Sequence, residues 1–157
     1  MLLPEIERRA AERFADFGLA ELFSRIVTPV ELLRERARAG QVWVATGGSD
    51  RPVGFAVAST LDGNAHLDEL DVHPDHGRRG IGTALVEMAC AWARAAGYGA
   101  VTLSTLRSVP WNAPFYVKLG FRILAETELT QALRQLLNSE ARLGLPMQDR
   151  VLMRRDL

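Results

Sequence analysis

Residues 72–83 constrain the fold of this chain more than any other segment. They read Val-His-Pro-Asp-His-Gly-Arg-Arg-Gly-Ile-Gly-Thr and join a β-like run to a strongly amphipathic helical pattern. The first backbone N–H groups of a helix have no partner within the helix, and the helix dipole adds partial positive charge at that end. A strand that passes through a glycine-rich turn into a helix therefore predicts an α/β domain with an anion-binding turn.

The residue types in this turn suit a phosphate. Gly80 and Gly82 carry no Cβ, so an anion can approach the backbone closely, while Arg78 and Arg79 offer charge-assisted hydrogen bonds. Together with Gly77, the glycine spacing matches neither the P-loop pattern GxxxxGK[ST] nor the dinucleotide pattern GxGxxG. The alternative is a glycine-rich turn that binds no ligand and carries two solvated arginines.

The hydropathy pattern of the whole chain predicts a mixed α/β domain. Two helices come first, one ended by Gly18 and one that begins at Thr28 as N-cap and ends at Gly40. Alternation of helical and β-like patterns then predicts, in order, strands over 41–45, 53–58 and 66–72, a helix over 81–95, a strand over 101–104, a short helix from 112, a strand over 121–124, a helix over 129–137 and a strand over 150–154. The first three strands form an antiparallel meander, and the order predicts one sheet flanked by helices.

Composition narrows the class of protein. A length of 157 residues fits one domain, 1–157, and a net charge of zero argues against a nucleic-acid partner. The single cysteine, Cys90, excludes a disulfide framework, and two histidines in one loop, His73 and His76, are too few ligands for a metal site. With no apolar run of membrane length and no apolar leader at the N-terminus, we expect a cytoplasmic protein without a membrane partner.

A second motif completes a family pattern. A tyrosine on the short helix, Tyr116, is followed by Gly120-Phe121. With Val72, Pro74 and the three glycines of the turn, the chain resembles the GCN5-related N-acetyltransferase superfamily, whose central motif is V-x-P-x-x-[QR]-x-x-G-x-[GA]. Gly77 departs from that motif, where the family has Gln or Arg, and the likeness covers residues 41–125. The family usually opens with a strand, which this chain is expected to lack.

The resemblance implies transfer of an acetyl group from acetyl-CoA to a primary amine, by direct attack and without an acyl-enzyme. In the family the turn holds the pyrophosphate, and the main chain of the preceding strand bonds the pantetheine. Carried onto this sequence, the cofactor-binding residues are Leu70, Asp71, Val72, Gly77, Arg78, Arg79, Gly80, Ile81, Gly82 and Thr83. The family also has an Asn seven residues before the tyrosine. Here Val109 stands there, so Asn112 is either a cofactor ligand or, as we favour, a helix N-cap.

The chemistry also needs a base and an acid. Alternation along 66–72 places His66 and Asp68 on one face and Glu69 on the other. A family base commonly projects from this strand four or six residues before Val72, which favours Asp68 and His66, with Glu69 third; the alternative is a row of solvated acidic residues. Tyr116 matches the family's general acid by position, or else it is a packing residue under the sheet.

The acceptor stays open between a small-molecule amine and a peptide amine. The leucine stripe over 129–137 is either core or a dimer face, so both a monomer and a homodimer are compatible with the sequence. Two other functions remain: a non-catalytic module that binds acyl-CoA, and a structural partner whose turn binds no nucleotide. A bulky residue at Gly82 would abolish CoA binding in an enzyme or a sensor and leave the structural partner intact.

Overall fold

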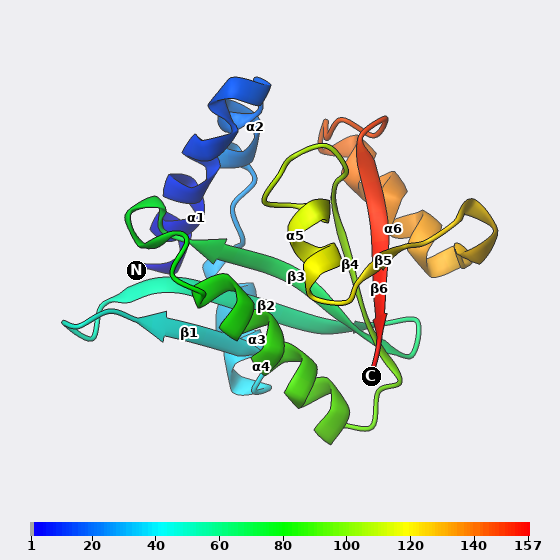
Figure 1. The fold of residues 1–157 in the computed structure, drawn as a ribbon, viewed down its shortest axis with the longest axis horizontal. Helices are drawn as coiled ribbons and strands as arrows, with labels where there is room; N and C mark the ends of the chain where they lie inside the picture. The colour runs from blue at the N-terminus through cyan, green and yellow to red at the C-terminus, as the bar shows by residue number, and fades with distance from the viewer. Residues whose placement is uncertain (1) are drawn as a thin grey trace. The chain divides into compact units, whose positions relative to one another are not determined.

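The structure is a computed structural model that describes residues 2–157, and its chain course is drawn in Figure 1. Clustering of contacts divides the chain into two compact units, which are described separately. The first contains residues up to Ala58 and Glu69–Ala89; the second contains Ser59–Asp68 and Cys90–Leu157. Three elements contribute residues to both units: β2 (Pro52–Leu61), β3 (Asn64–Val72) and α4 (Ile81–Ala95).

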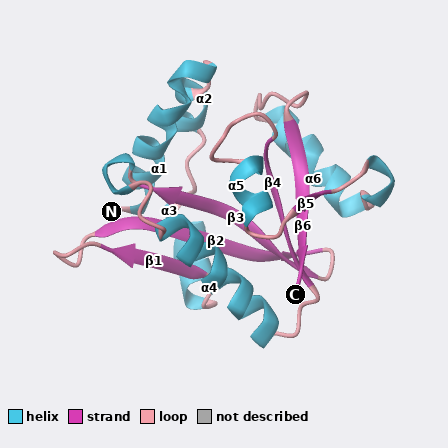
Figure 2. Cartoon of the chain, viewed as in Figure 1, coloured by secondary structure: helices cyan, strands magenta, loops and turns pink. Residues whose placement is uncertain are grey.

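The strands form one six-stranded sheet in the order β1-β2-β3-β4-β6-β5 (Figure 2). The remaining strands are β1 (Val42–Thr46), β4 (Ala100–Leu106), β5 (Arg122–Ile123) and β6 (Arg150–Asp156). β1 pairs antiparallel with β2, and β6 pairs antiparallel with both β4 and β5, whereas β3 and β4 are parallel. The predicted mixed, mostly antiparallel sheet flanked by helices is confirmed, and in residues 2–157 no strand precedes the first helix.

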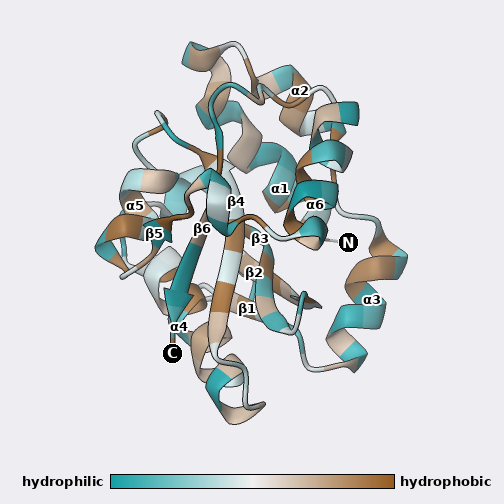
Figure 3. Cartoon of the chain, turned by 90° about the vertical axis from the view of Figure 1, so that its right-hand side faces the viewer, coloured by the Kyte–Doolittle hydropathy of each residue, from teal (hydrophilic) through white to brown (hydrophobic). Residues whose placement is uncertain are grey.

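The first unit begins with helices. These are α1 (Leu3–Ala11), the 3-10 helix η1 (Glu12–Phe17), α2 (Ala20–Arg25) and α3 (Val30–Arg38). Ile6 of α1 and Leu33 of α3 pack with Phe55 and Val57 of β2 in a buried core. Helix α3 carries hydrophobic and hydrophilic segments (Figure 3), as expected of a helix that buries one face. The six-residue helix α2 was not predicted, because it is too short to show a helical period.

The predicted N-cap at Thr28 is wrong. Helix α3 begins at Val30, and its N-cap position is occupied by Pro29, with no side-chain cap. Thr28 instead donates to the carboxylate of Glu7. Its backbone N–H lies 2.9 and 3.0 Å from the two Glu7 oxygens, and its hydroxyl lies 3.2 Å from Oε1. A buried carboxylate needs donors more than an exposed helix end does, because water reaches the helix end.

The second unit is built on β4 and β6, which pair antiparallel from Ala100↔Asp156 to Leu106↔Arg150. β3 and β4 are in parallel register over three pairs, from Ala65↔Val101 to Leu67↔Leu103. The unit also contains α5 (Ala113–Lys118), the 3-10 helix η3 (Glu126–Glu128) and α6 (Gln131–Arg142).

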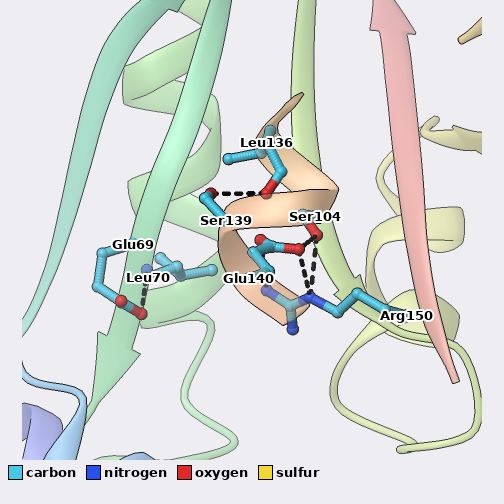
Figure 4. A network of polar contacts seen from close by, with 7 residues as sticks. All are labelled: Glu69, Leu70, Ser104, Leu136, Ser139, Glu140 and Arg150. Atoms are coloured by element: carbon cyan, nitrogen blue, oxygen red, sulfur yellow. Dashed lines mark hydrogen bonds and ion pairs between the residues drawn. The ribbon is translucent and has the colours of Figure 1, made fainter. Parts of the chain in front are cut away.

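A largely buried ion pair links α6 to the strands of this unit. Arg150 of β6 donates to Glu140 of α6 at 3.1 Å, and its Nε donates to Ser104 Oγ of β4 at 2.9 Å. Ser104 in turn donates to Glu140 at 2.8 Å (Figure 4). Both charged side chains are only 12–13% exposed, so the pair is screened little by water. Leu133 of α6 is buried. None of the helices in residues 2–157 is long and apolar enough to cross a membrane.

Candidate active site

The junction between β3 and α4 lies in the first unit. After β3 ends at Val72, the His73 N–H donates to the Val53 carbonyl at 2.8 Å, which ties the turn to β2. A short 3-10 helix follows over Pro74–His76. Helix α4 begins at Ile81, and the Ala84 N–H donates to the Gly80 carbonyl at 3.0 Å. The N–H groups of residues 81–83 precede that bond, so the helix itself offers them no acceptor.

Two residues of the turn have left-handed backbone conformations. Arg78 has a φ of +59° and Gly80 a φ of +78°. A Cβ added at Gly80 would meet nothing within 4 Å, so the glycine is required by its φ and open space lies beside it. An anion could occupy that space, beside the first N–H groups of α4 and the exposed side chains of Arg78 and Arg79.

A glycine in β2 lets three elements approach one another. A Cβ built on Gly54 would lie 3.0 Å from the Asp71 carbonyl oxygen of β3 and 3.2 Å from Ile81 Cγ2 of α4. Only glycine fits here without a shift of its neighbours. The sequence does carry this signal, because an isolated glycine within a strand pattern often marks a close approach of backbone.

Three carboxylates gather in the same unit. Glu7 of α1 and two residues of β3, Glu69 and Asp71, place oxygens within 4.8 Å of one another. Glu69 and Asp71 are two residues apart and share one side of β3, as alternation predicts. The Leu70 N–H donates to Glu69 Oε1 at 3.3 Å (Figure 4). Asp71 Oδ2 is buried and has no hydrogen-bond partner within residues 2–157. Glu7 was not predicted, because its contact with β3 is distant in sequence.

Burial and mutual repulsion raise the proton affinity of this cluster. Burial, and then the charge of Glu69, raise the pKa of Glu7 to about 7, while the hydrogen bonds from Thr28 act in the opposite direction. Burial also raises the pKa of Asp71 well above its ordinary value, followed by the charges of Glu69 and Glu7, and Arg13 opposes this. Glu7 and Asp71 therefore keep their protons to higher pH than isolated carboxyl groups do.

The other two predicted bases lie in the second unit. His66 is buried, with Nδ1 2.8 Å from the Thr102 hydroxyl of β4. Burial, followed by the charge of Arg150, lowers the pKa of His66 to about 4, so the imidazole is neutral at pH 7. Asp68 is exposed and accepts a hydrogen bond from the Ser59 hydroxyl at 2.9 Å.

Tyr116 also lies in the second unit, on α5. It is 8% exposed, and its ring makes edge contacts with Phe115 and Phe121 at centroid distances of 5.1 and 5.7 Å. Its backbone carbonyl accepts from the Phe121 N–H at 3.1 Å. Asn112 occupies the N-cap position of α5, as predicted, but its side chain makes no capping hydrogen bond.

Comparison with known proteins places the chain in a family. Residues 5–121 match the Acetyltransferase (GNAT) family, and the chain belongs to it. The resemblance found in the two sequence motifs is therefore confirmed, and the protein is an enzyme of the acyltransferase class.

Relatives and solved structures agree with this assignment. The peptidyl-lysine N-acetyltransferase YjaB of Escherichia coli is 29% identical over 121 residues, which cover 77% of this chain and 74% of the relative. N-acetylglutamate synthase of Neisseria gonorrhoeae, solved with coenzyme A and N-acetyl-glutamate, has a TM-score of 0.71 at 18% identity. That match covers 99% of this chain but only 33% of the gonococcal chain.

The PaiA N-acetyltransferase of Thermoplasma acidophilum, solved with coenzyme A, has a TM-score of 0.65 at 18% identity. The match covers 99% of this chain and 91% of that one. At such identities the two solved structures establish a shared fold.

Proposed function

We propose that this protein transfers an acetyl group from acetyl-CoA to the primary amine of a small molecule or peptide. The turn between β3 and α4 carries this proposal, because it combines left-handed Arg78 and Gly80 with the first N–H groups of a helix in a member of the GNAT family. An amine acceptor is also supported by the E. coli relative, which is named for action on peptidyl lysine.

In this proposal acetyl-CoA lies along β3 and the turn. The pyrophosphate binds the backbone N–H groups of Gly77–Thr83, and Arg78 and Arg79 neutralise its charge. The main-chain groups of Leu70, Asp71 and Val72 bond the pantetheine. The open space beside Gly80 supports this placement, since a Cβ there would point into it.

Glu69 is the proton acceptor that the surroundings favour. Glu69 lies beside Glu7 and Asp71, and the pKa of each of these two carboxyl groups is raised. Negative neighbours of this kind favour uptake of a proton from an alkyl ammonium, whose pKa is about 10.4. His66 is a poorer acceptor, because burial lowers its pKa to about 4. Asp68 is exposed and lies outside the carboxylate cluster.

The acetyl group passes directly from the sulfur of CoA to the nitrogen of the acceptor. The acceptor ammonium gives one proton to Glu69, and the free amine attacks the thioester carbonyl carbon. A C–N bond forms and the C–S bond breaks. The second proton of the amine nitrogen replaces the one that Tyr116 gives up, and Glu69 releases its proton to water. Tyr116 donates a proton to the departing CoA thiolate, whose pKa resembles the ~8.5 of a cysteine. The products are the amide, CoA thiol and one released proton, and no acyl-enzyme forms.

The proposal also includes a single catalytic domain over residues 1–157, a cytoplasmic location, and catalytic roles for Glu69 and Tyr116. Asn112 is available as a further cofactor ligand, because its side chain caps no helix. The alternative function is an acyl-CoA sensor without turnover, which would bind the cofactor through the same turn.

Thermal unfolding with acetyl-CoA, CoA and ATP tests the cofactor. Saturation at about a hundred times Kd adds ~2.7 kcal/mol, a rise in Tm of roughly 5–10 °C. We expect the rise with both CoA species and none with ATP, and Gly82→Trp should abolish it. Release of CoA thiol with a panel of amines then separates the enzyme from the sensor. Tyr116→Phe should lower turnover about 10²-fold and leave the Tm shift in place. Absence of any shift with either CoA species would refute the proposal.

A further inference from the structure

Glu7 is a buried acidic side chain in the first turns of α1, where the fold alone gives no reason for a charge. It is 6% exposed, and its helix neighbours Ile6, Ala10 and Ala11 form part of the apolar core. An apolar residue at this position would avoid the cost of burying a carboxylate. A carboxylate oxygen of Glu7 nevertheless lies within 4.8 Å of oxygens of Glu69 and Asp71 on β3.

We propose that Glu7 is a positioning residue for Glu69: held by Thr28 against the Glu69–Asp71 edge of β3, it sets the pH at which that edge accepts a proton. The inference rests on the proposed function, in which Glu69 takes the proton of the acceptor amine. Glu7 touches neither the cofactor nor the acceptor in this scheme and acts through Glu69.

Thr28 fixes the Glu7 carboxylate in place. Both Glu7 oxygens accept from the Thr28 backbone N–H, at 2.9 and 3.0 Å, and Oε1 also accepts from the hydroxyl at 3.2 Å. The carboxylate is therefore held by three contacts from one residue, which leaves it little rotamer freedom. Its charge stays at a fixed distance from Glu69 and Asp71, within the 4.8 Å that spans the cluster.

Asp71 provides the second observation. Its Oδ2 is buried and has no hydrogen-bond partner in the part of the chain that the structure describes. A buried carboxylate oxygen is ordinarily bonded to a donor. Burial and the charges of Glu69 and Glu7 raise the pKa of Asp71, and a side-chain hydrogen bond with Glu69 acts in the same direction. Asp71 and Glu69 are therefore linked, so a charge that Glu7 places beside them acts on both.

The other charges that face Glu7 are few. Glu69 and Asp71 lie on β3, Arg8 follows Glu7 on α1, and Arg13 on η1 interacts with Asp71. Arg8 is exposed and pairs with Glu5 at 3.4 Å. Removal of the Glu7 charge therefore leaves Glu69 and Asp71 with one fewer negative neighbour and an unchanged cationic one, which lowers the pH at which they ionise.

The variant Glu7→Gln distinguishes an electrostatic role of Glu7 from a purely structural one. The glutamine oxygen can take the place of Oε1, which accepts from both the Thr28 N–H and the Thr28 hydroxyl, so the variant keeps these two contacts and removes the charge. The readout is the titration of 13Cδ-labelled glutamates by NMR, without cofactor, for wild type and the variant. We expect the Glu69 midpoint to fall by about one pH unit in Glu7→Gln. Glu5→Gln, an exposed change on the same helix, should leave it in place.

The same shift should appear in catalysis. With an amine found in the thiol-release screen, the acid limb of kcat/KM should move down by about one pH unit in Glu7→Gln. A purely structural Glu7 would change the Tm or the maximal rate and leave the limb unmoved. If Glu7→Gln does not fold, Thr28→Val serves instead, because loss of one donor should raise the Glu7 midpoint.

An unmoved Glu69 midpoint in a folded Glu7→Gln would overturn the inference. Its failure is distinct from that of the proposed function. Loss of the acetyl-CoA response in thermal unfolding would refute the function, whereas the NMR titration reports on Glu7 and Glu69 with no cofactor present.

Discussion

The two ends of β3 keep titratable side chains buried in opposite ways. At the beginning of the strand, His66 is paired with the neutral Thr102 hydroxyl, and burial with the charge of Arg150 lowers its pKa to about 4. Near the other end, Glu69 and Asp71 share a cluster with Glu7, whose pKa rises to about 7. Burial favours the neutral form in both places, yet it makes the histidine a poor base and the carboxylates good ones.

This difference shows that residue type alone does not identify the catalytic base. Histidine is the side chain expected to titrate near neutral pH. Here the pKa of the buried Glu7 is raised to about 7 instead, because burial and the neighbouring charge of Glu69 both favour its neutral form. Four variants test or sharpen this contrast.

Glu69→Gln should have the largest effect. It removes the proposed proton acceptor, so kcat/KM with an amine acceptor should fall about 10²- to 10⁴-fold. Steady-state thiol release measures the loss. Glu31→Gln, at an exposed site on α3, is the matched control and should retain activity. A Glu69→Gln enzyme within threefold of wild type would remove Glu69 from the mechanism.

Gly54→Ala should disturb the carboxylate end of β3 through packing. The added Cβ would lie 3.0 Å from the Asp71 carbonyl oxygen, so β3 or α4 must move. We expect a loss of about 1–3 kcal/mol in unfolding free energy, measured by urea denaturation, and weaker binding of acetyl-CoA by calorimetry. Gly48→Ala, whose Cβ would meet nothing within 4 Å, should change neither. Equal effects of the two substitutions would contradict this packing argument.

Thr102→Val should affect the histidine end in stability only. It removes the partner of the buried His66 Nδ1 and should cost about 1–2 kcal/mol in urea denaturation. Because His66 is not the proton acceptor in this account, the acid limb of kcat/KM should not move. A shift of the acid limb of kcat/KM in Thr102→Val would indicate that His66 is the base.

Glu7→Gln should change the stability by an amount that depends on pH. The pKa of Glu7 is about 7 in the folded protein and 4.5 ordinarily, so the folded state binds more protons between these values. Its stabilising contribution is present below pH 4.5 and is lost as the pH rises through 7. The Tm of Glu7→Gln relative to wild type should therefore rise by roughly 5–10 °C between pH 5 and 8 in calorimetry. A constant or falling difference would contradict the raised pKa.

Features that depend on residues close together in the sequence could be predicted from it. The turn at 72–83 was predictable because its strand, glycines, arginines and helix are contiguous, so that one short pattern contains the whole signal. Most helices and strands followed from their periods. Glu69 and Asp71 were placed on one face of a strand by alternation alone, and the structure brings their oxygens together.

The features of the site that were not predicted depend on contacts between residues far apart in the sequence. Thr28 has the pattern of a helix cap, and only the position of α1 shows that its donors go to Glu7. Glu7 looks like one more charge on a surface helix until β3 is placed beside it. His66 was a strong candidate base by position, and its pairing with Thr102 across two strands makes it a weak one.

The pH dependence of kcat/KM, compared between wild type and Glu69→Gln from pH 4 to 9, tests the central claim most directly. The account predicts an acid limb near neutral pH in the wild type, set by the Glu7–Glu69–Asp71 cluster, and loss of that limb in Glu69→Gln. A limb that persists unchanged in Glu69→Gln would contradict it and assign the proton to another group.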